Sequence, residues 1–376
     1  INEMGRELIM KNKRIKSLLL ALILIVYCSP VVAVDNSKYE EHINNTDSNT
    51  EESETIETEE KSPVQVDLEE DDYAPGEIIV QYEGSGNVSL SSDENTIESE
   101  VVETLQSDED IVTELIKVAP EDQALALETL KQMPIVQYAE PNYKVRATAD
   151  TTGTVSNNWG QTMVKADIAQ NRVYNLSHNL QKKETEVIAI IDTGIDTNHP
   201  AFQRDGESLF TIGKDFVNND NTVYDNVIIN GVNEDAHGTH IAGIIAAQGE
   251  GMTGIAPENT KIMPLKVLSG EHGEGYVSDI LKAIDYADRN GADIVNCSWG
   301  LGERSQFLEN AIAGSDLIFI CAAGNDYSFI QQPYYSYPAC YPLDNVISVA
   351  SIDANEQLAN SSNRGSHITT KAPGVE

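Results

Sequence analysis

The stretch that decides the fold is Val187-Ile-Ala-Ile-Ile-Asp192-Thr-Gly-Ile-Asp196. Its first half is apolar throughout, and such continuous runs are typical of strands in a parallel sheet that is covered on both faces. The run ends at Asp192, immediately before a turn that contains Gly194. Because an isolated buried carboxylate is costly, we expect Asp192 to have a hydrogen-bonding partner. The segment therefore predicts a buried strand with an acid at its carboxyl end, where function gathers in such sheets.

The sequence beyond Trp159 repeats this pattern of apolar strands separated by helices. Strands are predicted at residues 262–267, 294–296 and 317–321, and helices at residues 237–247 and 277–290. Apolar strands that alternate with helices indicate a doubly wound parallel α/β sheet.

A smaller structured region precedes this sheet. Residues 77–82 and 135–138 have the composition of strands, and the second strand leads into residues 140–143. Between them, residues 120–133 predict a helix with Pro120 near its start. We expect its apolar face to consist of Ala124, Leu127 and Leu130. The pattern predicts a small α+β domain ahead of the large one.

The N-terminal residues are typical of a secretory leader. A basic segment from Met10 precedes an apolar run at residues 18–26, and the sequence Val31-Val32-Ala33 follows. These features predict a signal peptide with upstream residues over 1–33. The apolar run is too short to span a bilayer comfortably. We therefore expect a secreted, extracellular protein with no membrane attachment after the signal is removed.

Amino-acid composition and charge limit the classes of protein to which the chain can belong. Residues 34–73 are acidic and poor in large apolar side chains, so we expect a disordered acidic spacer. The formal net charge of −37 argues against nucleic-acid binding, because phosphates repel it. Cys28 should leave with the signal. The three remaining cysteines are too few for a disulfide framework and are expected to be buried free thiols: Cys297, Cys321 and Cys340.

A second motif, His237-Gly-Thr-His240-Ile-Ala-Gly243, opens one of the predicted helices. An imidazole at a helix N-terminus is held neutral by the positive end of the helix dipole, as a general base requires. Asp192 could orient this base. Two other interpretations stay open. His237 and His240 could bind a metal, although no third ligand or metalloprotease spacing is present. Alternatively, both the acid and the histidine could be structural.

A third motif, Ile320-Cys-Ala-Ala-Gly-Asn325, ends another strand with an amide side chain beside a glycine. An amide NH₂ in this position can donate a hydrogen bond to a developing oxyanion. Taken alone, it would be interpreted as an asparagine-containing turn.

Together, these three motifs and Lys371-Ala-Pro-Gly-Val375 resemble the successive signatures of the subtilisin family, in the family's order. The likeness covers residues 159–376. Residues 75–145 resemble the family's inhibitory prosegment, particularly at Gly76-Glu-Ile-Ile-Val and Tyr138-Ala-Glu-Pro-Asn-Tyr143. The resemblance implies a zymogen with a prosegment at residues 74–146, an exposed linker at 147–158 and a peptidase domain at 159–376.

The resemblance also implies roles for individual residues. Asp192 would orient His237, which would act as base and then as acid, and Asn325 would help to bind the oxyanion. The substrates would be polypeptides, with the chain's own prosegment as an intramolecular inhibitor and no organic cofactor. Peptide would add as an extended strand to a substrate-lining segment that consists of Ser298, Trp299 and Gly300. Asp326 would lie near the specificity pocket, and we hypothesise that it favours a basic residue before the scissile bond.

The sequence departs from the family at the nucleophile. The family's Gly-Thr-Ser-Met-Ala motif follows Ala-Pro-Gly, and the sequence ends at Glu376 without it. Ser361, Ser362 and Ser366 precede that landmark and are interpreted as turn residues. We expect the catalytic serine to lie beyond Glu376 and this fragment to be inactive. The alternative is a non-catalytic relative that binds or sequesters peptides or proteases.

Calcium is the second departure. Ala201 follows Pro200 where many relatives have a calcium-binding aspartate, so that site is expected to be absent. The loop at residues 215–222 instead resembles the calcium loop of thermitase-like members, with oxygen ligands that suit calcium. Its candidate ligands are Asp215, Asp220 and Thr222. A solvated Asn/Asp turn is an equal alternative for this loop.

Overall fold

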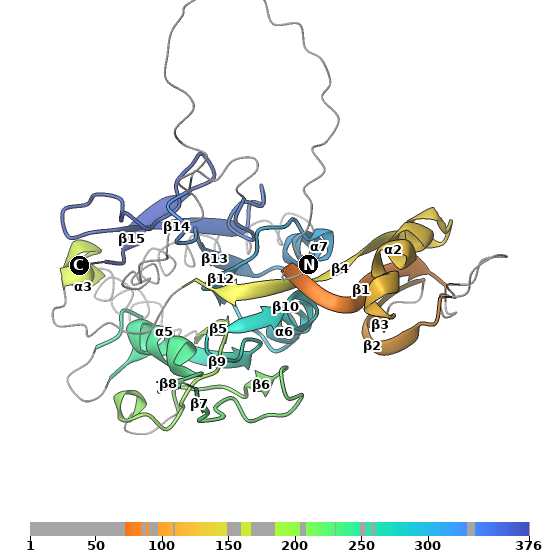
Figure 1. Cartoon of the computed structure of the whole chain (residues 1–376). Helices are drawn as coiled ribbons and strands as arrows, with labels where there is room; N and C mark the ends of the chain where they lie inside the picture. The colour runs from red at the N-terminus through yellow and green to blue at the C-terminus, as the bar shows by residue number, and fades with distance from the viewer. Residues whose placement is uncertain are drawn as a thin grey trace, which may run out of the picture.

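The computed structural model describes residues 72–84, 88, 90, 97–107, 110–148, 159–166, 185–203, 208–229, 231–248, 253–256, 260–328 and 335–375 (Figure 1). The expected signal peptide, the expected acidic spacer up to residue 71 and most of the expected linker lie outside these residues.

The N-terminal part is an antiparallel sheet with one helix packed on it. The strands are β1 (Tyr73–Glu83), β2 (Glu100–Ser107), β3 (Ile111–Lys117) and β4 (Val136–Ala147), in the order β4-β1-β3-β2. A 3₁₀ turn (Pro120–Asp122) leads into the helix α2 (Gln123–Gln132). Its buried residues pack with the apolar face of β1. This is the α+β unit that the sequence predicts.

The buried face of α2 agrees with the expected one at Leu130, and Leu127 packs against the same core, but it differs at Ala124. Ala124 is exposed, whereas Ala126 and Leu130 are fully buried. The reason lies at the start of the helix. The buried Gln123 side chain accepts a hydrogen bond from the Gly76 amide at 2.9 Å and donates to carbonyls of β1. These bonds direct the face containing residues 123, 126 and 130 onto the sheet, which turns Ala124 towards solvent.

The C-terminal part is built on a parallel sheet. Its strands have the order β15-β14-β13-β11-β5-β9-β6 and pair in parallel throughout. They are β5 (Glu186–Asp192), β6 (Lys214–Asp215), β9 (Thr260–Lys266), β11 (Ile294–Cys297), β13 (Ile318–Ala322), β14 (Val346–Ile352) and β15 (Thr370–Pro373). The sequence predicts β5, β9, β11 and β13 but not β14 or β15.

Helices cover both faces of this sheet, as expected of a doubly wound fold. α5 (Ala236–Ala246) packs on one face against Ile188 and Ile190. α6 (Val277–Arg289) and α7 (Gln306–Gly314) pack on the other face, in the cluster that contains Ala189 and Ile191. Alternate residues of β5 therefore serve opposite cores, which explains why its sequence is apolar throughout.

The two parts meet through β4 (Figure 1). The strand is much longer than expected, and its far end lies between β10 (Glu274–Tyr276) and β12 (Trp299–Gly300), antiparallel to both. Ala147, the expected first residue of an exposed linker, is thus paired with Trp299. The linker expectation fails at this residue because neighbouring backbone groups of the C-terminal part satisfy its hydrogen bonds.

Short elements complete the described chain. They are α3 (Trp159–Met163), a 3₁₀ turn (Pro200–Phe202), and the hairpin of β7 (Ile228–Ile229) and β8 (Val232–Asn233). Cys297, Cys321 and Cys340 are free and buried, as expected. No helix in the described part of the chain is long and apolar enough to cross a membrane.

Candidate active site

The structure brings the acid of the first motif against the histidine of the second. Asp192 is the last residue of β5 and is fully buried. Its Oδ1 lies 2.6 Å from Nδ1 of His237 and accepts a hydrogen bond from the Thr193 amide at 2.8 Å. The expected partner of the buried carboxylate is therefore an imidazole.

The start of α5 is docked onto the turn after β5. His237 is the second residue of the helix and is buried. The amide of Gly238 donates to Oγ1 of Thr193 at 3.1 Å, and Oγ1 of Thr239 accepts from the Asp196 amide at 2.9 Å. A Cβ at Gly238 would lie 2.3 Å from the Gly194 carbonyl oxygen, so this contact requires a glycine.

His240 does not join His237 in a metal-ligand group. Burial, together with the neighbouring His237, lowers the pKa of His240, so its imidazole is neutral. Among the described residues, the acidic, histidine or cysteine side chains that converge closely enough to hold a metal are Asp225, Glu234 and Asp235. The two histidines of the motif are thus not placed as a metal pair.

Asn325 follows β13 on a loop that a second asparagine supports. Gly324 has φ +98°, in the left-handed region, and a Cβ there would lie 2.4 Å from Nδ2 of Asn363. The buried Asn363 donates to the Ala323 carbonyl at 3.0 Å and accepts from the amides of Asp326 and Ser328. Sequence reasoning missed Asn363, since an asparagine in a polar turn carries no distinguishing signal.

The third motif faces the end of β4. The Asn325 side-chain amide donates to the Thr148 carbonyl oxygen. The Thr148 amide donates to the Ser298 carbonyl at 2.9 Å, and the Ala147 amide donates to the Gly273 carbonyl at 2.9 Å. The end of β4 is therefore an extended peptide held on both sides and in contact with Asn325.

The segment Ser298–Gly300 holds one side of the end of β4, and its three residues do so through different contacts. Ser298 binds Thr148, and Gly300 pairs with Arg146 through the backbone. The backbone of Trp299 also pairs with β4, but its indole is fully buried and donates to the Ile191 carbonyl at 3.0 Å. The Trp299 side chain thus packs in the core and stabilises β5 through this hydrogen bond.

Asp326 lines a cavity of about 400 Å³ beside Thr148. Gly300, Asn325 and Ser336 lie in the same wall. Oδ2 of Asp326 accepts a hydrogen bond from Asn363 at 3.1 Å. Asp326 thus lies in the wall of a cavity, and its role in substrate preference stays a prediction.

Comparison with known proteins decides the family. Residues 183–375 match the subtilase family, Peptidase_S8, and residues 59–142 match the fervidolysin N-terminal prodomain. The chain belongs to the subtilase family. It is 34% identical over 323 residues to the thermophilic serine proteinase of Bacillus sp. (strain AK1), covering 84% of this chain and 73% of that protein. It is 31% identical over 307 residues to the alkaline protease of Alkalihalobacillus alcalophilus, covering 80% and 70%.

Solved structures agree at the level of the fold. Fervidolysin from Fervidobacterium pennivorans, described as a keratinolytic enzyme related to subtilisin, matches with a TM-score of 0.57 and 21% identity. The match covers 82% of this chain and 48% of the fervidolysin chain, so this subtilase sequence spans about half the length of that solved protein. The resemblance inferred from the motifs is confirmed: the chain is a subtilase of the serine protease class with an N-terminal prodomain.

In the loop expected to bind calcium, the carboxylates of Asp215 and Asp220 accept hydrogen bonds from backbone amides of the same loop. Oδ1 of Asp215 accepts from the amides of Val217 and Asn218, at 2.8 and 3.0 Å. Asp220 accepts from the Thr222 amide at 2.6 Å, and the backbones of Asp215 and Asp220 pair with each other. The geometry is that of an Asx turn, and calcium binding by this loop stays a prediction.

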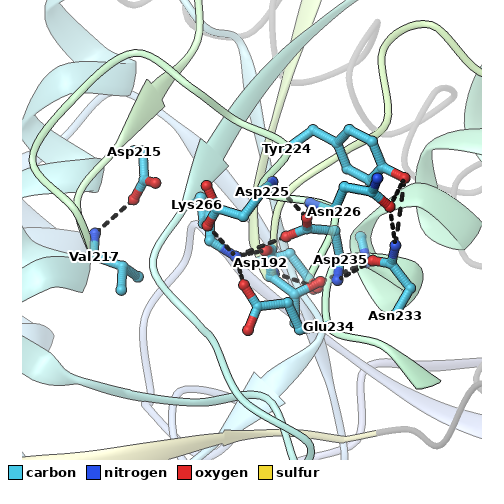
Figure 2. Close-up of polar contacts among 12 residues, drawn as sticks. Asp192, Asp215, Val217, Tyr224, Asp225, Asn226, Asn233, Glu234, Asp235 and Lys266 are labelled. Atoms are coloured by element: carbon cyan, nitrogen blue, oxygen red, sulfur yellow. Dashed lines mark hydrogen bonds and ion pairs between the residues drawn. The ribbon is translucent and has the colours of Figure 1, made fainter. Parts of the chain in front are cut away.

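The sequence motifs do not predict an acidic group that lies at the start of α5. Asp225, Glu234 and Asp235 place carboxylate oxygens within 4.8 Å of one another, and Figure 2 shows Lys266 reaching all three. Subtilases commonly bind calcium through such oxygens. Here, however, an ammonium group occupies the point on which the carboxylates converge, so these residues do not fit a calcium ion.

Proposed function

We propose that this subtilase chain belongs to a serine endopeptidase precursor that hydrolyses peptide bonds through an acyl-enzyme. Asp192 and His237 would form an Asp-His-Ser triad with a serine. The observation that carries the proposal is the 2.6 Å contact between buried Asp192 and Nδ1 of His237. An imidazole that donates Nδ1–H to a carboxylate presents Nε2 as an acceptor, which is how it takes the proton of a nucleophile.

The geometry around His237 suits a general base. The residue is buried in the first turn of α5, and its Nδ1 is held by the Asp192 carboxylate. A carboxylate in this position fixes the orientation of the ring and stabilises the imidazolium that forms when a proton is transferred. The imidazole could therefore accept a proton from a nucleophile and later return it.

Asn325 would bind the developing oxyanion. Its side-chain amide already donates to the carbonyl oxygen of Thr148, a ground-state peptide carbonyl held in an extended strand. If that carbonyl carbon were attacked, its oxygen would acquire negative charge at the end of the same hydrogen bond. A donor fixed before the reaction stabilises this charge without reorganisation.

The nucleophile would be supplied by a serine beyond Glu376 in the complete protein. In the described part of the chain, the hydrogen bond of His237 is to Asp192 and not to a hydroxyl. Ser362 is engaged elsewhere: its Oγ accepts from the Ser351 amide and donates to the Asn363 carbonyl. A groove lined by Ile241, Asn325 and Ala372 joins the site to the last described strand, which supports entry of the next segment there.

The N-terminal unit would be an inhibitory prosegment. The end of β4 fills the substrate cleft between β10 and β12. Glu140 accepts from the Ser305 hydroxyl at 2.5 Å and the Gln306 amide at 2.9 Å, which caps α7. Asn142 accepts from the Ser278 amide at 3.1 Å in the first turn of α6. Two capped helices and an occupied cleft would hold the prosegment in place until it is cut.

The cut that releases the prosegment would fall after Thr148. This residue presents its carbonyl oxygen to Asn325 and its amide to Ser298, as a substrate residue before the scissile bond must. The prosegment would then extend beyond the expected boundary at residue 146. The leader sequence at residues 10–33 supports secretion of the precursor.

The test uses the complete reading frame of the gene, treated with a fluorophosphonate probe that labels activated serines. We expect labelling of the wild type, no labelling after His237→Ala, and wild-type labelling after His272→Ala, which removes an exposed histidine. N-terminal sequencing of the labelled species should begin at residue 149. Absence of labelling in the wild type would point to a binding function instead, whereas labelling with another N-terminus would refute only the cleavage position.

A further inference from the structure

A fully buried lysine lies beside the candidate catalytic acid. Lys266 ends β9 and has no exposed surface. Its Nζ lies 2.7 Å from Oδ1 of Asp235 and 3.4 Å from oxygens of both Glu234 and Asp225. It also donates to the Thr193 carbonyl at 2.5 Å. Figure 2 shows this ammonium among the three carboxylates, with Asp192 nearby.

The sheet fixes the lysine in this position. Lys266 is directly opposite Asp192 in the register of β5 and β9. The amides of the two following residues, Val267 and Leu268, donate to the Asp192 carbonyl at 2.9 and 3.2 Å. The ammonium is therefore anchored to the same strand end that carries the acid.

The cluster keeps the lysine charged. Burial opposes the charge of Lys266, but the hydrogen bond and ion pairs with Asp235, Glu234 and Asp225 outweigh it and raise its pKa above the usual value. Buried charges are tolerated where they are paired and hydrogen-bonded. The carboxylates would otherwise need a metal ion, and calcium is the ion that such oxygens suit.

The lysine joins the two elements that carry the acid and the base. Thr193 donates its amide to Asp192, accepts the Gly238 amide at Oγ1, and offers its carbonyl to Lys266. Asp235 lies immediately before α5, and its Oδ2 accepts from the amides of Asp225 and Asn226. One ammonium therefore binds both the turn after β5 and the residue from which α5 begins.

We propose that Lys266 is a positioning residue: its ammonium takes the place of a metal ion and fixes the turn of Thr193 relative to α5, so that Asp192 meets His237. The inference rests on the proposed catalytic roles of Asp192 and His237. The contact between them can be observed without turnover, so its test does not require catalysis.

The first experiment records the Nδ1 proton of His237 by NMR in the 376-residue chain, with the signal assigned by its loss in His237→Gln. A proton shared with a buried carboxylate at 2.6 Å should resonate far downfield. We expect this signal to be lost or displaced in Lys266→Met and unchanged in Lys282→Met. Lys282 is the matched control because it is a partly buried lysine of α6 that is paired with two carboxylates, those of Asp279 and Glu103. An unchanged signal in Lys266→Met would overturn the proposal.

Lys266→Met leaves three carboxylates uncompensated and could fail to fold. The double variant Lys266→Met/Asp235→Asn removes both members of the 2.7 Å pair, which is far better tolerated than removal of one. It should fold and still lose the His237 signal. If neither variant folds, exchange of the Lys266 ammonium protons in the wild type decides: slow exchange supports the buried charge, and exchange at the rate of an exposed lysine refutes it.

A second experiment tests whether the Lys266 ammonium occupies a position that a calcium ion could otherwise fill. Lys266→Ala should show a calcium-dependent rise in Tm beyond any response of the wild type, because three carboxylates and the Thr193 carbonyl are then unoccupied. Lys266→Ala/Asp235→Asn should lose that gain. Equal calcium responses in all three proteins would contradict the proposed substitution.

In the complete protease, Lys266→Met should lower kcat about 100-fold with little change in KM, since misplacement of the base affects the chemical step.

Discussion

At the scale of single residues, the site shows which side chains a sequence reveals. Asp192 and Asn325 could be found because each is a polar residue at the end of an apolar strand, beside a glycine. Lys266 carries a comparable signal, because it is a charged residue inside the apolar run at residues 262–267. Asn363 gave none, because its role depends on a loop that lies 37 residues away in sequence. Residues whose partners are distant in sequence cannot be identified from local pattern alone.

Asp326 allows a test of substrate preference at this scale. Its carboxylate lines the pocket beside Thr148, and the basic residues Lys144 and Arg146 of β4 line the same pocket. A basic side chain in that pocket would lie near the carboxylate and gain about 1 kcal/mol in a partly exposed pair. In the complete protease, Asp326→Asn should therefore reduce kcat/KM for peptides with Lys or Arg before the scissile bond by about fivefold, and leave matched Leu peptides unchanged. Equal effects on both peptides would refute the preference.

At the scale of elements, the apolar pattern of a sequence identifies strands whose two faces are buried within their own domain. It fails for strands whose hydrogen-bonding partners belong to the other part of the molecule. β5 and β13 were predicted because their residues face two cores of the same sheet. The far half of β4 contains Pro141, Asn142 and Lys144, which are poor strand signals. It is extended because β10 and β12 provide partners from the other part of the molecule. β14 has a mixed apolar and serine composition and was missed for lack of such a run.

The contact between α5 and the turn after β5 gives a prediction at this scale. In Gly238→Ala, the new Cβ would lie 2.3 Å from the Gly194 carbonyl, so the start of the helix must move. We expect a loss of about 1–3 kcal/mol in the free energy of unfolding from this overpacking. Displacement of His237 by the order of 1 Å should reduce the rate of fluorophosphonate labelling about 100-fold.

Gly314→Ala is the matched control, because a Cβ at the end of α7 meets nothing within 4 Å. It should label at the wild-type rate and unfold at the same or a slightly higher urea concentration. Wild-type labelling of Gly238→Ala would show that the close approach of helix and turn is not required for the site.

At the scale of the whole molecule, the prosegment and the peptidase part are joined by groups that sequence inspection could not pair. Glu140 is buried against the start of α7, 165 residues away along the chain. Its hydrogen bonds to Ser305 and Gln306 favour the charged carboxylate, but burial has the larger effect and raises the pKa of Glu140 above its ordinary value of 4.5. The same carboxylate therefore fixes the prosegment and makes its docking sensitive to pH.

The direction of that sensitivity follows from the raised pKa. Folding with the prosegment docked favours the protonated form of Glu140, so its contribution is greatest below the unfolded pKa and is lost as pH rises through the folded pKa. Each unit of displacement corresponds to about 1.4 kcal/mol. From urea unfolding between pH 4 and 8, the wild type should gain stability relative to Glu140→Gln as the pH falls, whereas the exposed Glu128→Gln should follow the wild type at every pH. A wild type that loses stability relative to Glu140→Gln on acidification would mean that the helix cap outweighs burial. Acid would then loosen the prosegment instead of securing it.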